Sequence, residues 1–264
     1  MRYQGSKKKM TAILSRLVEK GAEGCTTYVE PFCGGANSLS AIDFNKKLTC
    51  DTNQYVIAFW NDVKNGKFTE DMWNFVKYLT KEQYYDIKED YKNNTGRYAD
   101  SIIGYVGCAC SYGGSWWNGY ANYNPNKNEN HIYEAYNGTI KQINSFKHLN
   151  NTDFICCDYK SIMDHANGKS FIYCDPPYGN TKKYANDFNN DEFWEWCRNT
   201  AKDGHVLMIS EYDAPKDFIP IYHKKMQDGM ASINGEKNEK IFVLKTQFEK
   251  FGTVFDNSKN KRYY

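Results

Sequence analysis

The sequence has little net charge and no long apolar run. Its 264 residues contain 34 Lys and Arg against 32 Asp and Glu, a net charge of +2, so any basic surface for nucleic acid must be local. No apolar stretch approaches the length of a membrane span, and no apolar segment follows the basic residues 7–9. We therefore expect neither a membrane protein nor a secretory signal. The length suits one catalytic domain with a sizeable insertion.

Metal sites and phosphate-binding loops of the common kinds are also missing. Among the nine cysteines, Cys108 and Cys110 are the only close pair whose spacing suggests a metal site, and no second such pair or spaced histidine couple completes a zinc site. We therefore expect no metal, and we expect the cysteines to be reduced thiols in a cytoplasmic protein. The sequence contains no G-K-[ST] motif, and the glycine turn after Glu30 is not G-x-G-x-x-G.

Residues 171–178, Phe-Ile-Tyr-Cys-Asp-Pro-Pro-Tyr, predict a buried strand that stops at a stiff corner. Pro176 and Pro177 have no amide hydrogen for a ladder, and a proline biases the residue before it toward extended geometry. The corner would present the Asp175 carboxylate, the Pro176 carbonyl and the Tyr178 ring. These groups fit an exocyclic amine on a flat heterocycle, whose two hydrogens are accepted while its ring is stacked. The alternative is a structural turn with a capping aspartate.

Residues 26–51 have the layout that binds an adenosine-bearing cofactor in doubly wound sheets. A strand at residues 26–30 is followed by the turn at residues 31–35, by a helix that opens at residues 36–41, and by a strand at residues 48–51 that ends on Asp51. Glycines in such a turn let the backbone approach the ligand. An acid about twenty residues after the first strand receives the ribose hydroxyls.

The N-terminal segment, residues 2–7, precedes a predicted helix. Apolar residues recur at three- and four-residue spacing from Met10 to Val18, which predicts that helix. The segment itself is either a frayed terminus or an arm whose Tyr3 and Lys7 could reach a ligand. Further strands are expected near residues 153–158, 204–210 and 240–244. One more helix is expected near residues 193–197.

The periodicity and composition of the sequence change between about residues 61 and 150. Amphipathic helices are predicted at residues 70–79 and 83–91, whereas residues 111–125 keep neither helical nor strand periodicity. That tract is rich in Gly, Asn and aromatic residues, so it predicts a loop with large exposed faces that could stack on bases, wedge between them or bond their edges. The alternative is a tyrosine-rich lid packed on the core. The candidate DNA-contacting residues are Tyr112, Trp116, Trp117, Asn118, Tyr120 and Asn122.

Together these motifs resemble those of the N6-adenine DNA methyltransferases of the Dam-like, D12 class. The matching motifs are residues 2–7, residues 30–36, Asp51 and residues 175–178. They occur in the family's order, with a long insertion between the cofactor half and the catalytic half. The resemblance spans nearly the whole chain, and the combination is specific although each motif alone is not.

The resemblance implies transfer of a methyl group from S-adenosylmethionine to the N6 amine of an adenine flipped out of double-stranded DNA. The cofactor residues that it implies are Tyr3, Lys7, Phe32, Gly34, Gly35, Asp51, Asp158 and Asp175. The catalytic residues that it implies are Asp175, Pro176, Pro177 and Tyr178. Dam-like enzymes carry an Arg-bearing loop that reads GATC, whereas this loop offers two Trp and an Asn, so the recognition sequence stays open. N4-cytosine methylation and a catalytically silent DNA-binding relative are the alternatives.

We therefore expect an α/β, Rossmann-like S-adenosylmethionine-dependent methyltransferase fold with a mixed, doubly wound sheet. Residues 1–60 and 151–264 would form the catalytic domain, and residues 61–150 an inserted, mainly helical target recognition domain. We expect double-stranded DNA as the partner, no membrane and no metal, a monomer or weak dimer, and a cytoplasmic enzyme of a bacterium or a phage. A restriction–modification system with a cognate endonuclease and an orphan phage enzyme are the two settings left open.

Overall fold

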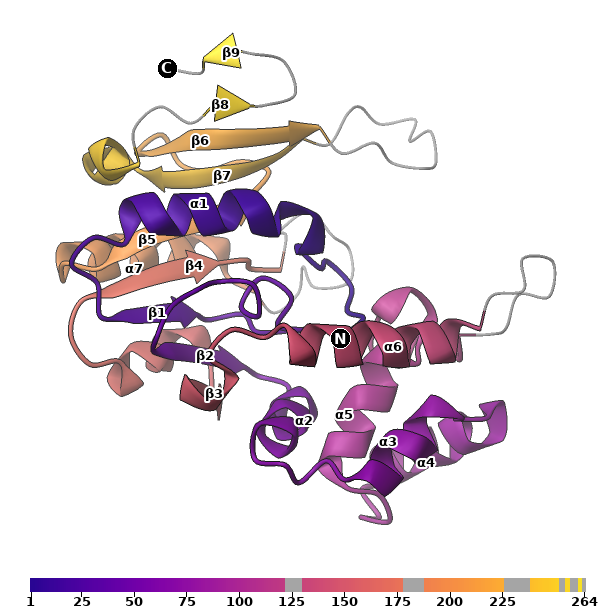
Figure 1. Cartoon of the computed structure of the whole chain (residues 1–264). Coiled ribbons are helices and arrows are strands. Elements are labelled where there is room, and N and C mark those ends of the chain that lie inside the picture. The colour runs from indigo at the N-terminus through magenta and orange to yellow at the C-terminus, as the bar shows by residue number, and fades with distance from the viewer. Residues whose placement is uncertain (122–129, 178–187, 226–237, 252–254, 257–260, 263–264) are drawn as a thin grey trace. The chain divides into compact units, whose positions relative to one another are not determined.

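Figure 1 shows the computed structural model, which describes residues 1–121, 130–177, 188–225, 238–251, 255–256 and 261–262. Two predicted site residues, Asn122 and Tyr178, lie outside the described residues. The chain forms two compact units, residues 1–15 with 33–162 and residues 16–32 with 163–264. Helix α1 (Thr11–Gly21) begins in the first unit and ends in the second. None of the described helices combines the length and the apolar character that a membrane span needs.

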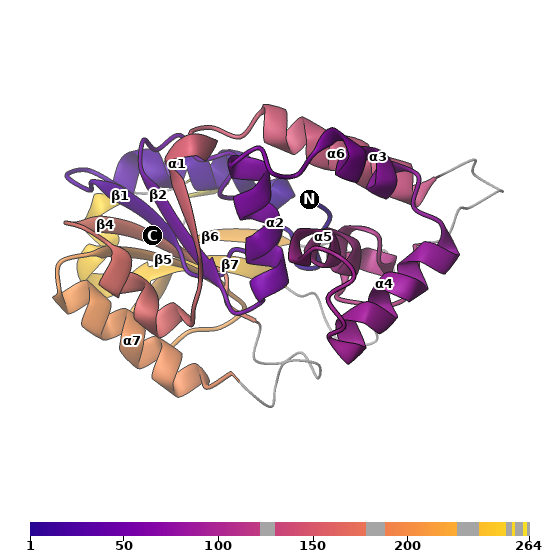
Figure 2. The same ribbon diagram turned by 90° about the horizontal axis from the view of Figure 1, so that it is seen from below.

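The second unit is built on a mixed sheet with the strand order β1-β4-β5-β7-β6. β1 (Thr27–Glu30), β4 (Ser170–Cys174) and β5 (Val206–Glu211) pair in parallel. β7 (Asn238–Leu244) pairs antiparallel with β5 and with β6 (Phe218–Lys225). Helix α7 (Asn190–Lys202) packs against β5 (Figure 2). β8 (Phe255–Asp256) and β9 (Lys261–Arg262) form a short antiparallel pair.

All residues of β1, β4 and β5 are buried. A parallel strand that is covered on both faces reads as a continuous apolar run rather than as an alternation. That is why the run at residues 171–174 was recognisable as a strand in the sequence. The predicted mixed α/β sheet is confirmed by these parallel and antiparallel pairings.

The first unit combines a parallel strand pair with helices. β2 (Lys47–Asp51) pairs with β3 (Thr152–Cys156), and Asp51 lies opposite Cys156. The helices are α2 (Gln54–Lys64), α3 (Glu70–Lys77), α4 (Lys81–Asn93), α5 (Asp100–Ala109) and α6 (His131–Asn144). Residues 61–150 are therefore mainly helical over their described part.

Helix α5 is the central helix of the first unit. It packs against α2, α3, α4 and α6, and Figure 2 shows it between α2 and α4. A Cβ atom at Gly104 would lie 2.0 Å from the carbonyl oxygen of Tyr55, so a glycine is required where the backbones of α5 and α2 meet. This contact fixes the start of α2, which begins three residues after Asp51 in the chain.

The predicted helix at residues 36–41 is wrong, because these described residues form turns. Ala36 has a φ of 49°, which is left-handed rather than helical. Side chains also bond the carbonyl oxygens that a helix would use: the amide of Gln142 bonds that of Ala36, and the amine of Lys47 bonds that of Leu39. The N–H of Ser40 still bonds the carbonyl oxygen of Ala36 at 3.0 Å, but no helix opens from the left-handed Ala36.

Candidate active site

The glycine turn is tied to the end of β2 through Asp51. The backbone N–H of Gly34 donates to Oδ2 of Asp51 at 2.9 Å, and that of Asn53 donates to Oδ1 at 2.9 Å. The N–H of Cys33 donates to the carbonyl oxygen of Cys50 at 2.8 Å. Burial raises the pKa of Asp51, although backbone N–H groups around it act in the opposite direction. The carboxylate is therefore fixed in position before any ligand arrives.

The glycines of this turn leave room for Tyr3. A Cβ atom at Gly34 would lie 2.7 Å from Cε1 of Tyr3, and one at Gly35 would lie 2.6 Å from its Cβ. Gly34 also has a φ of 45°, which favours glycine. The N–H of Gln4 donates to the carbonyl oxygen of Gly114 at 2.9 Å, so the N-terminal arm is anchored and the frayed-terminus alternative is wrong. The arm places an aromatic ring directly on the glycine turn.

Two side chains that the sequence reasoning missed hold the same turn. Nε2 of Gln142 donates to the carbonyl oxygens of Gly35 and Ala36, both at 2.9 Å. Nε1 of Trp60 donates to the carbonyl oxygen of Gly34 at 3.4 Å. Gln142 belongs to the buried stripe of α6, which also contains Ile132, Ala135 and Thr139. A side-chain amide within such a buried stripe was the signal in the sequence for this role, because a buried polar group needs hydrogen-bond partners.

The remaining predicted cofactor residues of the first unit have less defined roles. Lys7 is buried, and its amine donates to the carbonyl oxygen of Gly5 at 3.3 Å. Asp158 is exposed, and its Oδ1 accepts the N–H of Lys160 at 3.0 Å. The sequence predicted a strand that ends on Asp158, whereas β3 ends at Cys156. Because β2 and β3 are parallel and paired in register, Asp51 and Asp158 still lie at the same end of the strand pair.

The acid–proline corner belongs to the second unit. β4 ends at Cys174, Asp175 is half-buried and Pro176 is buried. Phe32 follows the neighbouring parallel strand β1, so both residues lie at the carboxyl edge of the sheet, where ligands of such sheets bind. The Phe32 ring packs edge-on against those of Phe188 and Phe193, with centroid distances of 6.0 and 5.9 Å.

Negative charge gathers at this carboxyl edge. The hydroxyl group of Tyr173 lies 2.8 Å from that of Ser210. Burial raises the pKa of Tyr173 well above its usual value, and the carboxylates of Asp175, Glu30 and Glu239 raise it further. An edge with this charge favours a group that becomes positive during a reaction.

The aromatic loop after α5 divides into packed and exposed side chains. Trp117 is 7% exposed, and its ring lies 5.2 Å from that of Tyr84 between centroids. Tyr120 donates its hydroxyl to the carbonyl oxygen of Leu79 at 2.8 Å. Tyr112 and Asn118 are exposed. Packing on the core therefore describes Trp117 and Tyr120, and a contact surface is open at the other two residues.

Comparison with known proteins identifies the family. The family model of the D12 class N6 adenine-specific DNA methyltransferases matches residues 3–214. The chain belongs to this family. The family and the enzyme class expected from the motifs are thus confirmed, and adenine is favoured over cytosine as the base that this methyltransferase modifies.

Individual relatives support the same assignment over most of the chain. The Type II methyltransferase M.MjaIII of Methanocaldococcus jannaschii is 24% identical over 253 residues, which cover 80% of this chain and 84% of the relative. The DNA adenine methylase of Vibrio cholerae is 26% identical, covering 81% of this chain and 80% of the relative. The DNA adenine methylase of Escherichia coli is 25% identical, covering 70% and 66%.

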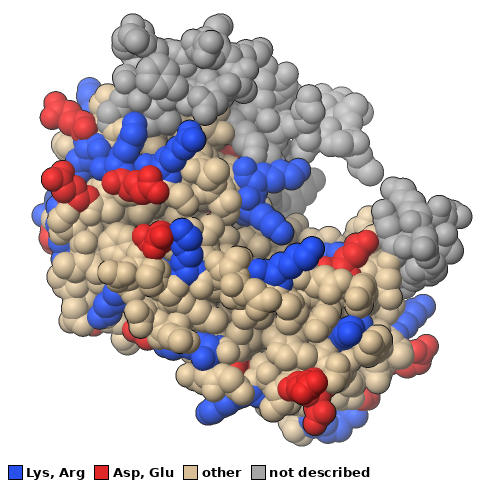
Figure 3. All heavy atoms as spheres, in the orientation of Figure 1, with Lys and Arg blue, Asp and Glu red and all other residues tan. Residues whose placement is uncertain are grey.

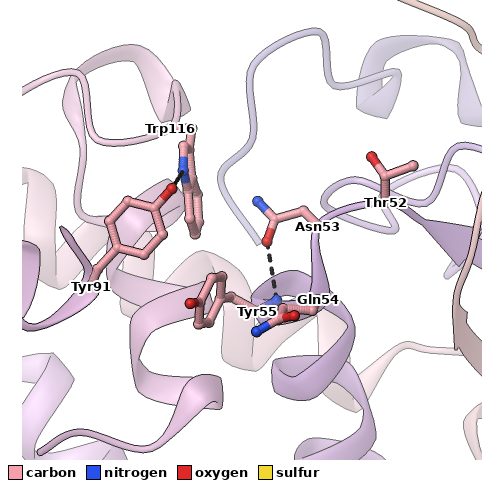
Figure 4. A pocket seen from close by; sticks show the side chains of 6 residues that line it. All are labelled: Thr52, Asn53, Gln54, Tyr55, Tyr91 and Trp116. Atoms are coloured by element: carbon pink, nitrogen blue, oxygen red, sulfur yellow. Dashed lines mark hydrogen bonds between the residues drawn. The ribbon is translucent and has the colours of Figure 1, made fainter. Parts of the chain in front are cut away.

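A pocket of about 410 Å³ lies in the first unit of the methyltransferase, next to the start of α2 (Figure 4). One side of it is aromatic and the other side carries neutral polar groups. Two of its polar residues are exposed, so the pocket opens to solvent. Its lining residues are Thr52, Asn53, Gln54, Tyr55, Tyr91 and Trp116.

The surface charges of the methyltransferase are mixed. On the face seen in Figure 3, Lys and Arg lie beside Asp and Glu over the described residues, in keeping with the net charge of +2. In the part of the chain that the structure describes, no group of three or more His, Cys, Asp or Glu side chains could hold a metal ion.

Proposed function

We propose that this methyltransferase transfers the methyl group of S-adenosylmethionine to the N6 amine of an adenine that is turned out of double-stranded DNA. The observation that carries the proposal is the placement of Asp175. It follows a fully buried parallel strand, it is half-buried, and Pro176 directly behind it is buried. A carboxylate at the carboxyl edge of a sheet, directly before a buried proline, suits the orientation of a substrate amine.

The residues of the first unit fit the cofactor. A carboxylate offers about four acceptor sites, so Asp51 keeps capacity for a ribose diol beside its backbone hydrogen bonds. Tyr3 supplies an aromatic face at the glycine turn, and Asp158 lies at the same strand ends for the adenine amine. Lys7, Gly34 and Gly35 complete the proposed cofactor-binding residues of the first unit. When bound, S-adenosylmethionine supplies an electrophilic methyl group.

The acid–proline corner would prepare the adenine. The N6 lone pair of adenine is delocalised into the ring, so the amine is a poor nucleophile. Hydrogen bonds from its two N–H groups to the Asp175 carboxylate and the Pro176 carbonyl would localise that pair and aim it. Such positioning can supply several kcal/mol. The carboxylates near Tyr173 favour the positive charge that develops on the nitrogen.

The DNA-side roles belong to the same proposal. A paired adenine must leave the duplex to reach such a corner, and Tyr178 and Pro177 would then flank its ring. Tyr112 and Asn118 are exposed and free to meet DNA. The domain limits at residues 61 and 150, a monomer or weak dimer, a cytoplasmic setting, and either a restriction partner or an orphan phage role remain predictions from the sequence.

Long-read modification mapping of DNA from cells that express the protein tests the proposal. We expect N6-methyladenine at one recurring sequence, absent from cells without the gene. N4-methylcytosine would contradict the choice of base. Unmodified DNA, together with purified protein that transfers no labelled methyl group to DNA, would favour the catalytically silent alternative.

A further inference from the structure

The aromatic side of the pocket in Figure 4 consists of rings that hold one another in place. Tyr55 and Trp116 lie nearly parallel, with an interplanar angle of 25° and a centroid distance of 6.0 Å. Tyr91 stands edge-on to both, at 5.3 Å from Tyr55 and 5.4 Å from Trp116. Nε1 of Trp116 also donates to the hydroxyl of Tyr91 at 3.3 Å. The result is a preformed aromatic wall.

The opposite side of the pocket offers neutral hydrogen-bonding groups. Oδ1 of Asn53 accepts the N–H groups of Tyr55 and Val56, at 3.1 and 3.3 Å, and thereby caps α2. Figure 4 shows the amide of Asn53 pointing toward Trp116, with the amide of Gln54 close to Tyr55. None of the lining residues carries a formal charge, so the pocket does not suit a phosphate or a carboxylate.

A nucleobase has the chemistry that these two sides require. Its face stacks on an aromatic ring, and its edge presents the donors and acceptors that an amide can bond. The volume of about 410 Å³ falls in the ~300–1,000 Å³ range of small-ligand sites. We propose that the pocket binds a base of the DNA other than the target adenine, an inference that rests on the proposed function for its DNA partner.

The placement of the pocket favours a DNA base over the adenine ring of the cofactor. The residues that meet at the glycine turn, Tyr3, Gly34 and Gly35, do not line it. Two of its three rings, Tyr91 of α4 and Trp116 of the loop after α5, lie within the stretch expected to recognise the target, and the third, Tyr55, lies at the start of α2. Asn53 connects the two regions, because its backbone N–H bonds Asp51 while its side chain faces the pocket.

The geometry restricts which base can enter. A base stacked inside a duplex has both faces covered, so an occupant must be at least partly unstacked. The pocket would thus read a base that the bound DNA exposes next to the reaction. Its amides then contribute to the sequence preference, and the rings contribute affinity that does not depend on salt.

Variants of Trp116 and Gln54 test this inference. The Trp116 ring covers Gly107, where a Cβ atom would lie 2.5 Å from it, so Trp116→Ala can also disturb packing. Trp116→Phe keeps a ring, and Gln54→Ala changes an exposed side chain. Tyr78→Ala is the matched control, because Tyr78 is 67% exposed and lies outside the pocket. Melting temperatures identify any variant that fails to fold.

The binding measurement uses a short duplex whose sequence is selected for affinity to the wild type rather than for methylation. Trp116→Ala should weaken duplex binding roughly 5- to 100-fold, the loss expected for one stacked base. Trp116→Phe should lose less, Gln54→Ala should lose part of the sequence preference, and Tyr78→Ala should match the wild type. Affinity for S-adenosylmethionine should stay the same in all of them.

An abasic scan of that duplex identifies the occupant. At one position, removal of the base should weaken binding by the wild type but not by Trp116→Ala, because the two changes remove the same contact, and Trp116→Phe should show a loss between the two. Independent losses at every position would overturn the proposal, as would a loss of S-adenosylmethionine affinity with duplex binding unchanged. Methyl transfer is assayed separately, so absence of turnover with a coupled position would reject the proposed activity and leave the base pocket standing.

Discussion

The carboxylate of Asp51 accepts the backbone N–H of Gly34 at 2.9 Å, which joins the end of β2 to the glycine turn. Trp60 and Gln142 bond the carbonyl oxygens of the same turn. Hydrogen bonds therefore join the acid and the turn, and they fix the position of the Asp51 carboxylate. This arrangement leads to the first two predictions.

Replacing Asp51 by Asn should weaken the binding of S-adenosylmethionine. The substitution removes the charge on which a charge-assisted hydrogen bond to the ribose depends, so a loss of about 1.5–3 kcal/mol is expected. Isothermal titration calorimetry measures it directly. Asp153→Asn is the control, because Asp153 is an exposed acid of β3 in the same unit. Equal affinities for the Asp51 variant and the wild type would rule out the ribose role.

The same substitution has a predicted effect on the pH dependence of stability. Burial raises the pKa of Asp51 above 3.8, so the folded chain binds this proton more tightly than the unfolded chain. The stability that this proton contributes is fully present below pH 3.8 and is lost as the pH rises through the raised pKa. The unfolding free energy of the wild type minus that of Asp51→Asn should therefore fall over this window in urea titrations. A rise would mean that the backbone hydrogen bonds outweigh burial.

Much of the cofactor side was predictable because its signals are local. The strands at residues 26–30 and 48–51, the glycine turn and the acid at the strand end follow from short stretches of sequence. The predicted helices at residues 70–79 and 83–91 likewise correspond to α3 and α4, because each exposes one face and buries the other.

The missed elements lack such local signals. Residues 101–109 of α5 are all buried, so no amphipathic pattern marks the helix. β6 contains Pro220 and has an irregular register there, features that argue against a strand in the sequence. The helix predicted at residues 36–41 is wrong because Ala36 has a left-handed φ, and side chains also bond the carbonyl oxygens of Ala36 and Leu39. One of these partners, Gln142, lies 106 residues away in the chain and cannot be read from local spacing.

Gln142→Leu should destabilise the glycine turn. It leaves the carbonyl oxygens of Gly35 and Ala36 without this donor, which costs about 1–3 kcal/mol for buried groups. The loss is partly offset because Oε1 of Gln142 is itself buried without a hydrogen-bond partner among the described residues. Denaturant titration measures the unfolding free energy, and S-adenosylmethionine affinity should fall with it. Lys141→Ala, an exposed neighbour on α6, should change stability by less than about 0.5 kcal/mol.

Asp175→Asn should reduce methyl transfer by about 10²–10³-fold, the usual effect of removing one oriented polar group from a reacting centre. The fold and the binding of S-adenosylmethionine should survive, with the binding at most weakened, because the amide keeps the shape of the acid. A labelled-methyl assay beside calorimetry separates the two effects. Asp213→Asn provides the control, since the Asp213 side chain is 96% exposed. Turnover near the wild-type rate in Asp175→Asn would refute the proposed amine contact.

Trp117 and Asn118 are adjacent, and the structure predicts opposite consequences for their replacement. Trp117 is 7% exposed and packs against Tyr84 and Tyr91, so Trp117→Ala should lower the unfolding free energy by about 3–5 kcal/mol. Asn118 is exposed, so Asn118→Ala should leave stability within about 0.5 kcal/mol of the wild type.

Discrimination between DNA sequences should be affected in the opposite order from stability, with the effect in Asn118→Ala. If Asn118 contacts a base edge, its loss reduces discrimination between target and non-target duplexes by about 1–3 kcal/mol. The salt dependence of binding should stay the same in Asn118→Ala, because an uncharged side chain releases no counterions. Affinities for both duplexes at two salt concentrations, measured beside the melting temperature, check each part. Unchanged discrimination in a stable Asn118→Ala protein would remove this residue from the recognition surface. A Trp117→Ala protein with wild-type stability would show instead that the packing seen around its ring contributes little, and that the loop is available as a whole for contact with DNA.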